Sequence, residues 1–183
     1  MTTTGEKTMS VEEYIQFELT SERRHEYING QLFEMPGEQV INSVITNLLT
    51  AYLATLLNEK GYRICSNVVK IAIPGESRYY YPDWFITKES LGESNRYIQY
   101  EPEMIVEVIS KTSRIHDTVN KYIDYTKIPS LKYYLIIDPD RTHITVNSKD
   151  DKGEWEAEAY SNREDVIQMP MLQIDLPLNK IYR

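Results

Sequence analysis

The stretch that most constrains the fold is residues 103–110, Glu-Met-Ile-Val-Glu-Val-Ile-Ser. Its four β-branched residues and its methionine predict a strand of a buried sheet. Side chains alternate along a strand, so Glu107 shares one face with Ile105 and Ile109. An ionised carboxylate among apolar neighbours is costly unless a cation or a hydrogen-bond donor accompanies it. The sequence therefore predicts a partner for Glu107.

Three other residues are candidate companions of this carboxylate. Asp83 follows Pro82 inside a predicted strand, residues 79–87, and Lys121 lies on a predicted helix, residues 114–127, directly after the Glu107 strand. Glu26 lies on the first strand of a hairpin predicted by Asn-Gly at positions 29 and 30, because both residues of such a turn need positive φ. A two-residue loop pairs Glu26 with Phe33, so Glu26 points inward if that face is the core face.

The order of the predicted elements defines an α/β class with a mixed β-sheet flanked by helices and with N-terminal and C-terminal β-hairpins. The step from the Glu107 strand through the Lys121 helix to a strand at residues 133–138 implies a right-handed parallel crossover. A capping box at Ser10 and Glu13 begins a first helix, and Gly61 ends the longest one. The remaining predicted elements are helices at 11–19 and 38–60, strands at 24–28, 31–35, 62–65, 68–73, 142–147 and 155–160, a surface loop at 88–100, and short edge strands within 165–183.

Composition narrows the class of protein. The 183 residues fit a flexible tail, residues 1–9, and a single domain, residues 10–183. A single cysteine, Cys65, fits a reducing compartment, and no apolar run approaches membrane-spanning length, so we expect a cytoplasmic protein. The net charge of −8 argues against indiscriminate nucleic-acid binding, although a local basic rim is compatible with it. Fifteen tyrosines suggest an interface, such as that of a homodimer.

The residues of this set suit metal-assisted phosphodiester hydrolysis. Mg²⁺ prefers oxygen ligands, and Asp83, Glu107 and the main-chain carbonyl of Val108 would supply them. A bound Mg²⁺, or Mn²⁺, neutralises charge on a phosphate and activates water. Lys121 would orient the water or the phosphate as a point charge. The residues thus predict a metal site for hydrolysis of a phosphodiester, and DNA becomes the expected substrate through the resemblance described next.

The same motifs resemble the Uma-type endonuclease family of the PD-(D/E)XK, or restriction-endonuclease-like, superfamily. The resemblance is carried, in this order, by Pro-Asp at 82–83, Glu-Val-Ile-Ser at 107–110, the spacing of Asp117, Lys121 and Tyr125, and Tyr-Tyr-Leu-Ile-Ile-Asp-Pro at 133–139. It implies a restriction-endonuclease-like fold and a metal-dependent endonuclease. The superfamily lysine lies two residues after the acidic residue, where this chain has Ile109, and the resemblance implies that Lys121 replaces it from the following helix. Family members also tend to carry a proline and a histidine where this chain has Lys111 and Asn42.

Other interpretations of these residues remain open at this point. Glu107 and Lys121 would also suit a structural ion pair, and Glu26 would also suit a solvated hairpin face. The three histidines lack metal-ligand spacing and are expected at the surface. The alternative functions are a catalytically inactive nucleic-acid-binding or regulatory protein and a structural homo-oligomer on the same scaffold.

Overall fold

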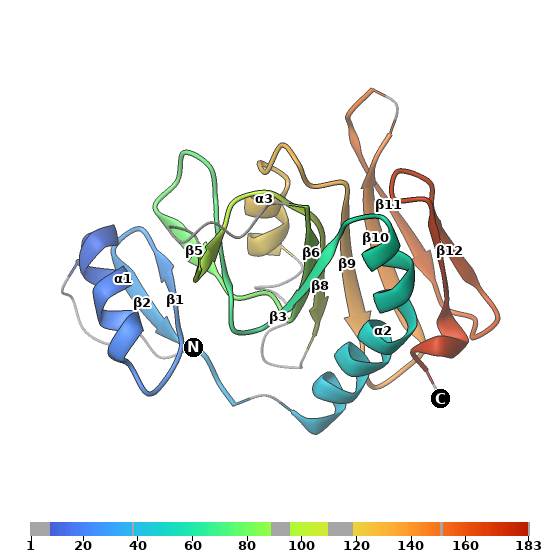
Figure 1. Cartoon of the computed structure of the whole chain (residues 1–183), viewed down its shortest axis with the longest axis horizontal. Helices are drawn as coiled ribbons and strands as arrows, with labels where there is room; N and C mark the ends of the chain where they lie inside the picture. Colours follow the sequence, from blue (N-terminus) through green and yellow to red (C-terminus); the bar gives the residue numbers. More distant parts are fainter. Residues whose placement is uncertain (1–7, 38, 89–95, 110–118, 151, 183) are drawn as a thin grey trace.

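The computed structural model describes residues 8–37, 39–88, 96–109, 119–150 and 152–182, which form two main sheets and a C-terminal hairpin. The six-stranded sheet has the order β11-β10-β9-β8-β6-β3, and the five-stranded sheet has the order β2-β1-β5-β4-β7. Figure 1 shows the five-stranded sheet with α1 at one end of the molecule and the β12–β13 hairpin at the other. The fold is mixed α/β, as the sequence predicted.

The six-stranded sheet carries the predicted Glu107 strand in its middle. β8 pairs with β9 in parallel and with β6 antiparallel, which confirms the predicted parallel crossover. The strands of this sheet are β3 (Arg63–Ser66), β6 (Trp84–Thr87), β8 (Pro102–Val108), β9 (Tyr133–Asp138), β10 (His143–Lys149) and β11 (Trp155–Tyr160).

The five-stranded sheet begins with the predicted hairpin. Asn29 and Gly30 have φ of 50° and 91°, and the register pairs Glu26 with Phe33, as the two-residue loop requires. The N–H of Met9 donates to the carbonyl of Gly30, so this end of the predicted tail is attached to the hairpin turn. The strands are β1 (His25–Ile28), β2 (Gln31–Glu34), β4 (Lys70–Ala72), β5 (Arg78–Tyr80) and β7 (Ile98–Gln99).

One predicted strand is wrong in its extent. Residues 79–87 form two strands, β5 and β6, which belong to different sheets. The chain passes from one sheet to the other at Tyr81, Pro82 and Asp83, because Pro82 has no N–H with which to continue a ladder. The expected surface loop at 88–100 likewise contains β7, whose residues are buried.

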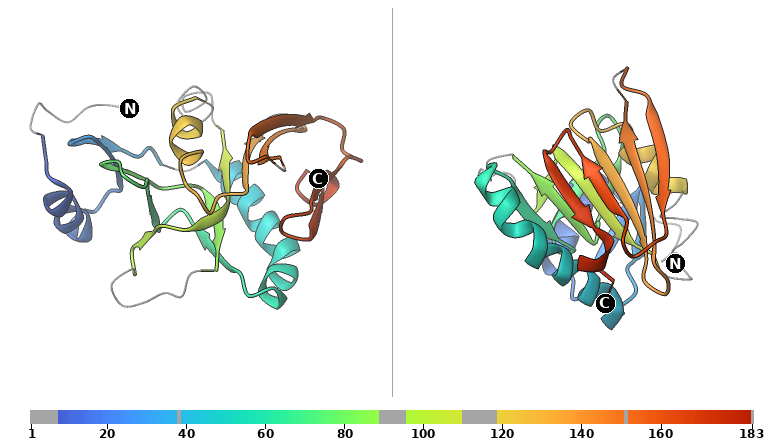
Figure 2. Two further views of the ribbon diagram at one scale, coloured as in Figure 1. Left: turned by 90° about the horizontal axis from the view of Figure 1, so that it is seen from above. Right: turned by 90° about the vertical axis from the view of Figure 1, so that its right-hand side faces the viewer.

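Two helices cover opposite faces of the six-stranded sheet (Figure 2). The long helix α2 (Val40–Glu59) packs Ile45, Leu49, Leu53 and Leu57 against the face that carries Met104 and Val106. The short helix α3 (Lys121–Tyr125) packs on the other face, beside Ile105 and Tyr134. Gly61, with φ of 78°, follows α2 as predicted. The predicted helix at 114–127 is described only from residue 119, and its earlier part lies outside the described residues.

The remaining elements are α1 (Val11–Thr20), β12 (Val166–Met169), β13 (Ile174–Pro177) and the 3₁₀ turn η3 (Leu178–Lys180). The capping box of α1 is present, since Ser10 and Glu13 each accept the other's backbone N–H. Contrary to the sequence expectation, α2 is long and apolar enough to cross a membrane by length and composition, and Glu59 is its single charged residue. Its buried leucines show it packed as a core helix of the domain.

Candidate active site

The structure brings Glu107, Lys121 and Glu26 together in the space between the two main sheets. The Nζ of Lys121 lies 2.9 Å from Glu107 Oε1 and 3.0 Å from Glu26 Oε1. Glu107 is 2% exposed, Glu26 1% and Lys121 4%. Each carboxylate comes from a different sheet, Glu26 from β1 and Glu107 from β8, and the lysine comes from α3. Glu26 therefore points inward, and the solvated alternative for this residue is wrong.

A tyrosine also forms a hydrogen bond with Glu107. The hydroxyl of Tyr125 donates to Glu107 Oε1 at 2.9 Å, from the same helical face as Lys121. Burial raises the pKa of the Tyr125 phenol well above its usual value, and the neighbouring Glu107 carboxylate raises it further. Tyr125 thus stays protonated and keeps donating. In the sequence, Tyr125 was one of three residues whose spacing resembles the family. The signal for its contact with Glu107 was its position four residues after Lys121, which places both side chains on one side of a helix.

Asp83 lies at the point where β6 leaves β8. The last paired residues are Trp84 and Val106, and one further step along this antiparallel register sets Asp83 across from Glu107. The Oδ2 atom of Asp83 accepts the backbone N–H of Val108 at 2.7 Å. Asp83 is half-buried, so it is the carboxylate of the set with the most access to solvent.

The carbonyl of Val108 has a neighbour that the sequence analysis did not assign to the site. Asn42, in the first turn of α2, donates its Nδ2 to this oxygen at 3.1 Å. Asn42 reaches the end of β8 from the side opposite to Lys121, because α2 and α3 cover different faces of the sheet. The sequence did give one signal for Asn42, since it occupies a position at which family members tend to carry a histidine.

A second network surrounds the buried carboxylate of Asp124 on α3. Asp124 accepts hydrogen bonds from Arg78 at 2.6 and 2.7 Å, from the Tyr80 hydroxyl at 2.6 Å and from Lys127 at 3.1 Å. Burial alone would raise the pKa of the Asp124 carboxyl, but these hydrogen bonds hold it below its usual value. Nothing in the sequence distinguished Asp124 from a solvated helix residue.

The surroundings of the histidines and of the cysteine can be described next. His25 is buried and its Nδ1 lies 3.1 Å from Glu18, so the expectation of a surface residue is wrong. His143 is half-buried beside Ser161, and His116 lies outside the described residues. Cys65 is partly buried against the core that contains Phe85.

The oxygen atoms at the end of β8 fit a hard divalent cation. Asp83 accepts the N–H of Val108, Glu107 is the preceding residue on the strand, and Val108 adds its carbonyl; oxygen is the ligand type that Mg²⁺ and Mn²⁺ favour. Within the described part of the chain, no cluster of three or more His, Cys, Asp or Glu side chains is arranged as a metal site. The fit thus depends on two carboxylates and a main-chain oxygen, with remaining positions left to water or substrate, as is usual for Mg²⁺.

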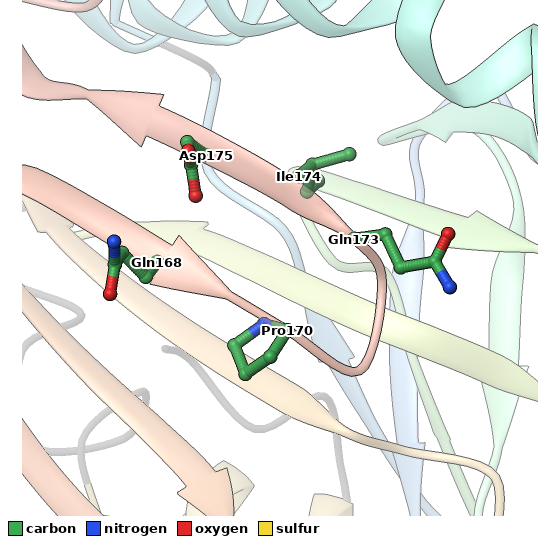
Figure 3. A pocket seen from close by; sticks show the side chains of 5 residues that line it. All are labelled: Gln168, Pro170, Gln173, Ile174 and Asp175. Carbon is green, nitrogen blue, oxygen red and sulfur yellow. The ribbon is translucent and has the colours of Figure 1, made fainter.

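A separate open pocket of 310 Å³ lies on the C-terminal hairpin (Figure 3). Gln168 and Asp175 face each other across β12 and β13, and Pro170, Gln173 and Ile174 complete its lining. It shares no residue with the acidic set. Its single carboxylate gives no basis for assigning a function to it.

Comparison with known proteins assigns the chain to a family. Residues 11–179 match the model of the Uma2 family, described as "Putative restriction endonuclease". The chain belongs to this family. The match covers all four of the predicted side-chain positions, Glu26, Asp83, Glu107 and Lys121. The resemblance inferred from the motifs is thereby confirmed.

Individual relatives match between 72% and 96% of the chain. The uncharacterized protein slr1290 of Synechocystis sp. is 29% identical over 176 residues, which are 96% of this chain and 92% of that protein. The uncharacterized protein sll1609 of the same organism is 26% identical over 72% of this chain and 76% of its own length. The crystal structure of a "putative nuclease belonging to DUF820" from Anabaena variabilis superposes with a TM-score of 0.78 at 15% identity, covering 95% of this chain and 97% of that one. This last similarity establishes the shared fold.

Proposed function

We propose that this Uma2 family member is a metal-dependent endonuclease that hydrolyses DNA phosphodiester bonds. The observation that supports the proposal best is the buried contact of Lys121 with Glu107, next to Val108, whose N–H donates to Asp83. It occurs in a chain whose family is described as "Putative restriction endonuclease". Mg²⁺ or Mn²⁺ would be held by Asp83, Glu107 and the Val108 carbonyl. When bound, such an ion supplies charge neutralisation at the phosphate and an activated water.

The side chains of the chain itself have separate tasks in this proposal. Tyr125 and Lys121 both contact Glu107 Oε1, which fixes the orientation of that carboxylate. Glu26 contacts the ammonium of Lys121 from the other sheet and holds it beside Glu107. The Lys121 ammonium is therefore placed as a point charge for an anionic group, in the role that the superfamily lysine has two residues after the acid. Glu26 is best described as orienting Lys121.

The proposal is tested by cleavage of supercoiled plasmid with Mg²⁺ or Mn²⁺. We expect Asp83→Ala and Glu107→Gln to reduce cleavage by on the order of 100-fold or more, as loss of a metal ligand does. Asp175→Asn, at an exposed carboxylate on β13, is the control and should cut like the wild type. Equal cutting by wild type, Asp83→Ala and Glu107→Gln would assign the activity to a contaminant and contradict the proposal.

The tyrosines, which suggested an interface, do not favour the alternative of a structural homo-oligomer. Tyr80 and Tyr81 of the three-tyrosine run are buried and Tyr79 is half-buried, and within the described residues only Tyr97 and Tyr100 are exposed. The tyrosines are mainly packing residues of the two sheets. A homodimer thus stays a prediction, which sedimentation equilibrium of the intact protein would test.

A further inference from the structure

At the end of β8, the N–H and the carbonyl of one residue, Val108, have side-chain partners in place of a neighbouring strand. β6 pairs with β8 only as far as Trp84 and Val106, and the N–H of Ile109 donates to Ile137 on the β9 side. Main-chain groups of successive residues point to alternate edges of a strand, so the groups of Val108 point to the edge that β6 has left. Side chains take over there: Asp83 accepts the N–H at 2.7 Å, and Asn42 donates to the carbonyl at 3.1 Å.

The orientation of the Asn42 amide is fixed by this contact. A carbonyl oxygen only accepts, so the Nδ2 of Asn42 must face Val108 and its Oδ1 must face away. Asn42 is 7% exposed, and among the described residues its Oδ1 has no hydrogen-bond partner. Buried acceptors are rarely left unpaired, because desolvation without a partner is unfavourable. An unused acceptor therefore lies beside the main-chain oxygen that is a candidate metal ligand.

We infer that Asn42 is a positioning residue of the proposed metal site. Its Nδ2 holds the Val108 carbonyl in place, and its Oδ1 accepts a hydrogen bond from a water molecule in the hydration shell of the divalent cation. The inference rests on the proposed function, since it assigns a role toward the cation that the endonuclease would use. Groups of this kind, which orient a ligand and a bound water, commonly change metal affinity by about 10-fold to 100-fold.

A matched control exists in the same chain. Asn147 on β10 is also buried, at 6% exposure, and donates its Nδ2 to the Tyr134 carbonyl at the same distance of 3.1 Å. Asn42→Ala and Asn147→Ala thus each remove a buried amide that donates to a main-chain carbonyl of a strand. Of the two residues, only Asn42 contacts the end of β8.

The experiment measures Mn²⁺ binding by calorimetry, with no DNA present, for wild type, Asp83→Ala, Asn42→Ala and Asn147→Ala. We expect wild type to bind, Asp83→Ala to lose binding, Asn42→Ala to bind about 10-fold more weakly, and Asn147→Ala to bind like wild type. Wild-type binding with equal Kd values for Asn42→Ala and Asn147→Ala would overturn the inference alone. Absence of Mn²⁺ binding by the wild type would overturn both the inference and the proposed function.

A second variant separates a role toward the cation from a purely structural one. Asn42→Asp keeps an acceptor but replaces the donor that faces the Val108 carbonyl, so two oxygens meet there when no cation is present. We expect its metal-free melting temperature to be below that of the wild type and Mn²⁺ to raise it by more degrees than it raises the wild type. A melting temperature of Asn42→Asp that Mn²⁺ leaves unchanged would contradict the inference.

Discussion

Asp83 combines two interactions that respond differently to substitution. Its Oδ2 accepts the Val108 N–H, and its charge lies across the register from Glu107. The hydrogen bond needs only an acceptor, which an asparagine retains. The charge matters because like charges at one site disfavour each other's ionised form. Substitution by Asn and by Ala should therefore separate the two contributions.

We predict that Asp83→Asn raises the melting temperature of the metal-free protein by about 2–4 °C, the shift that about 1 kcal/mol gives in a domain of this size. Asp83→Ala leaves the Val108 N–H without its acceptor and should lower stability by roughly 1–3 kcal/mol. Thermal unfolding in the presence of a chelator measures both variants. If Asp83→Asn melts at or below the wild-type temperature, Asp83 is mainly a cap for Val108.

Asp124 gives a prediction about pH. Hydrogen bonds from Arg78, Tyr80 and Lys127 outweigh the effect of burial and keep its pKa below the usual value. A carboxyl with a depressed pKa in the folded state contributes stability that is fully present above its unfolded pKa of about 3.9. That contribution is lost as the pH falls through the folded pKa, because the folded carboxyl then takes up its proton.

We expect Asp124→Asn to lower the free energy of unfolding at pH 7 by about 3 kcal/mol, as removal of one partner from a buried pair does. The difference from the wild type should shrink as the pH falls below about 4. Urea titrations at pH 7 and at successively lower pH measure this, with the exposed Asp175→Asn as control. A difference that is independent of pH would mean that the charge of Asp124 contributes little.

At the scale of the elements, α3 connects the two main sheets through one side chain. Lys121 contacts Glu26 on β1 and Glu107 on β8, and its Nζ lies 5.8 Å from the centre of the Tyr80 ring on β5. All three side chains of the ion-pair set are at least nine-tenths buried. Removing this ammonium takes a cation away from two carboxylates in a space with little access to water.

We predict that Lys121→Met lowers the free energy of unfolding by about 3–5 kcal/mol, the range for breaking a buried pair. Adding Glu26→Gln should restore part of this loss, because one of the two carboxylates that lost the ammonium is then neutral. Denaturant titration of the two single variants and the double variant gives the coupling free energy between Glu26 and Lys121. Additive effects would show that the contact between the two side chains contributes nothing to stability.

The elements also show what the sequence could predict. The strand at 133–138, the hairpin register at Glu26 and the parallel step across Lys121 follow from local patterns, and the structure confirms them. The division of residues 79–87 between two sheets does not follow, because alternation shows that a segment is extended but not which partner it pairs with. Asn42 and Asp124 were missed as network members for a related reason. Their partners, Val108 and Arg78, are 66 and 46 residues away along the chain.

On the scale of the whole molecule, the candidate site exists only where three packed units meet. The six-stranded sheet supplies Glu107, and the connection that leads into its strand β6 supplies Asp83. The five-stranded sheet supplies Glu26, and α3 supplies Lys121. The chain as a whole carries a net charge of −8. Its overall field therefore repels a polyanion, and any attraction for the proposed DNA substrate would have to arise locally.

We predict that DNA binding depends on a divalent cation rather than on the protein's own charge. The wild type in Ca²⁺ should bind a labelled duplex more tightly than the wild type in chelator. Ca²⁺ is used because it seldom supports cleavage where Mg²⁺ does, and Glu107→Gln is left out because it alters the site. Fluorescence anisotropy at several salt concentrations measures both the affinity and its salt dependence.

A protein that binds through many lysine–phosphate contacts shows a steep loss of affinity with salt. Binding through a cation-occupied acidic site involves few such contacts and should show a shallow loss of affinity. Tight binding in chelator with a steep salt dependence would contradict this prediction and would favour the alternative of a non-catalytic nucleic-acid-binding protein on the same scaffold.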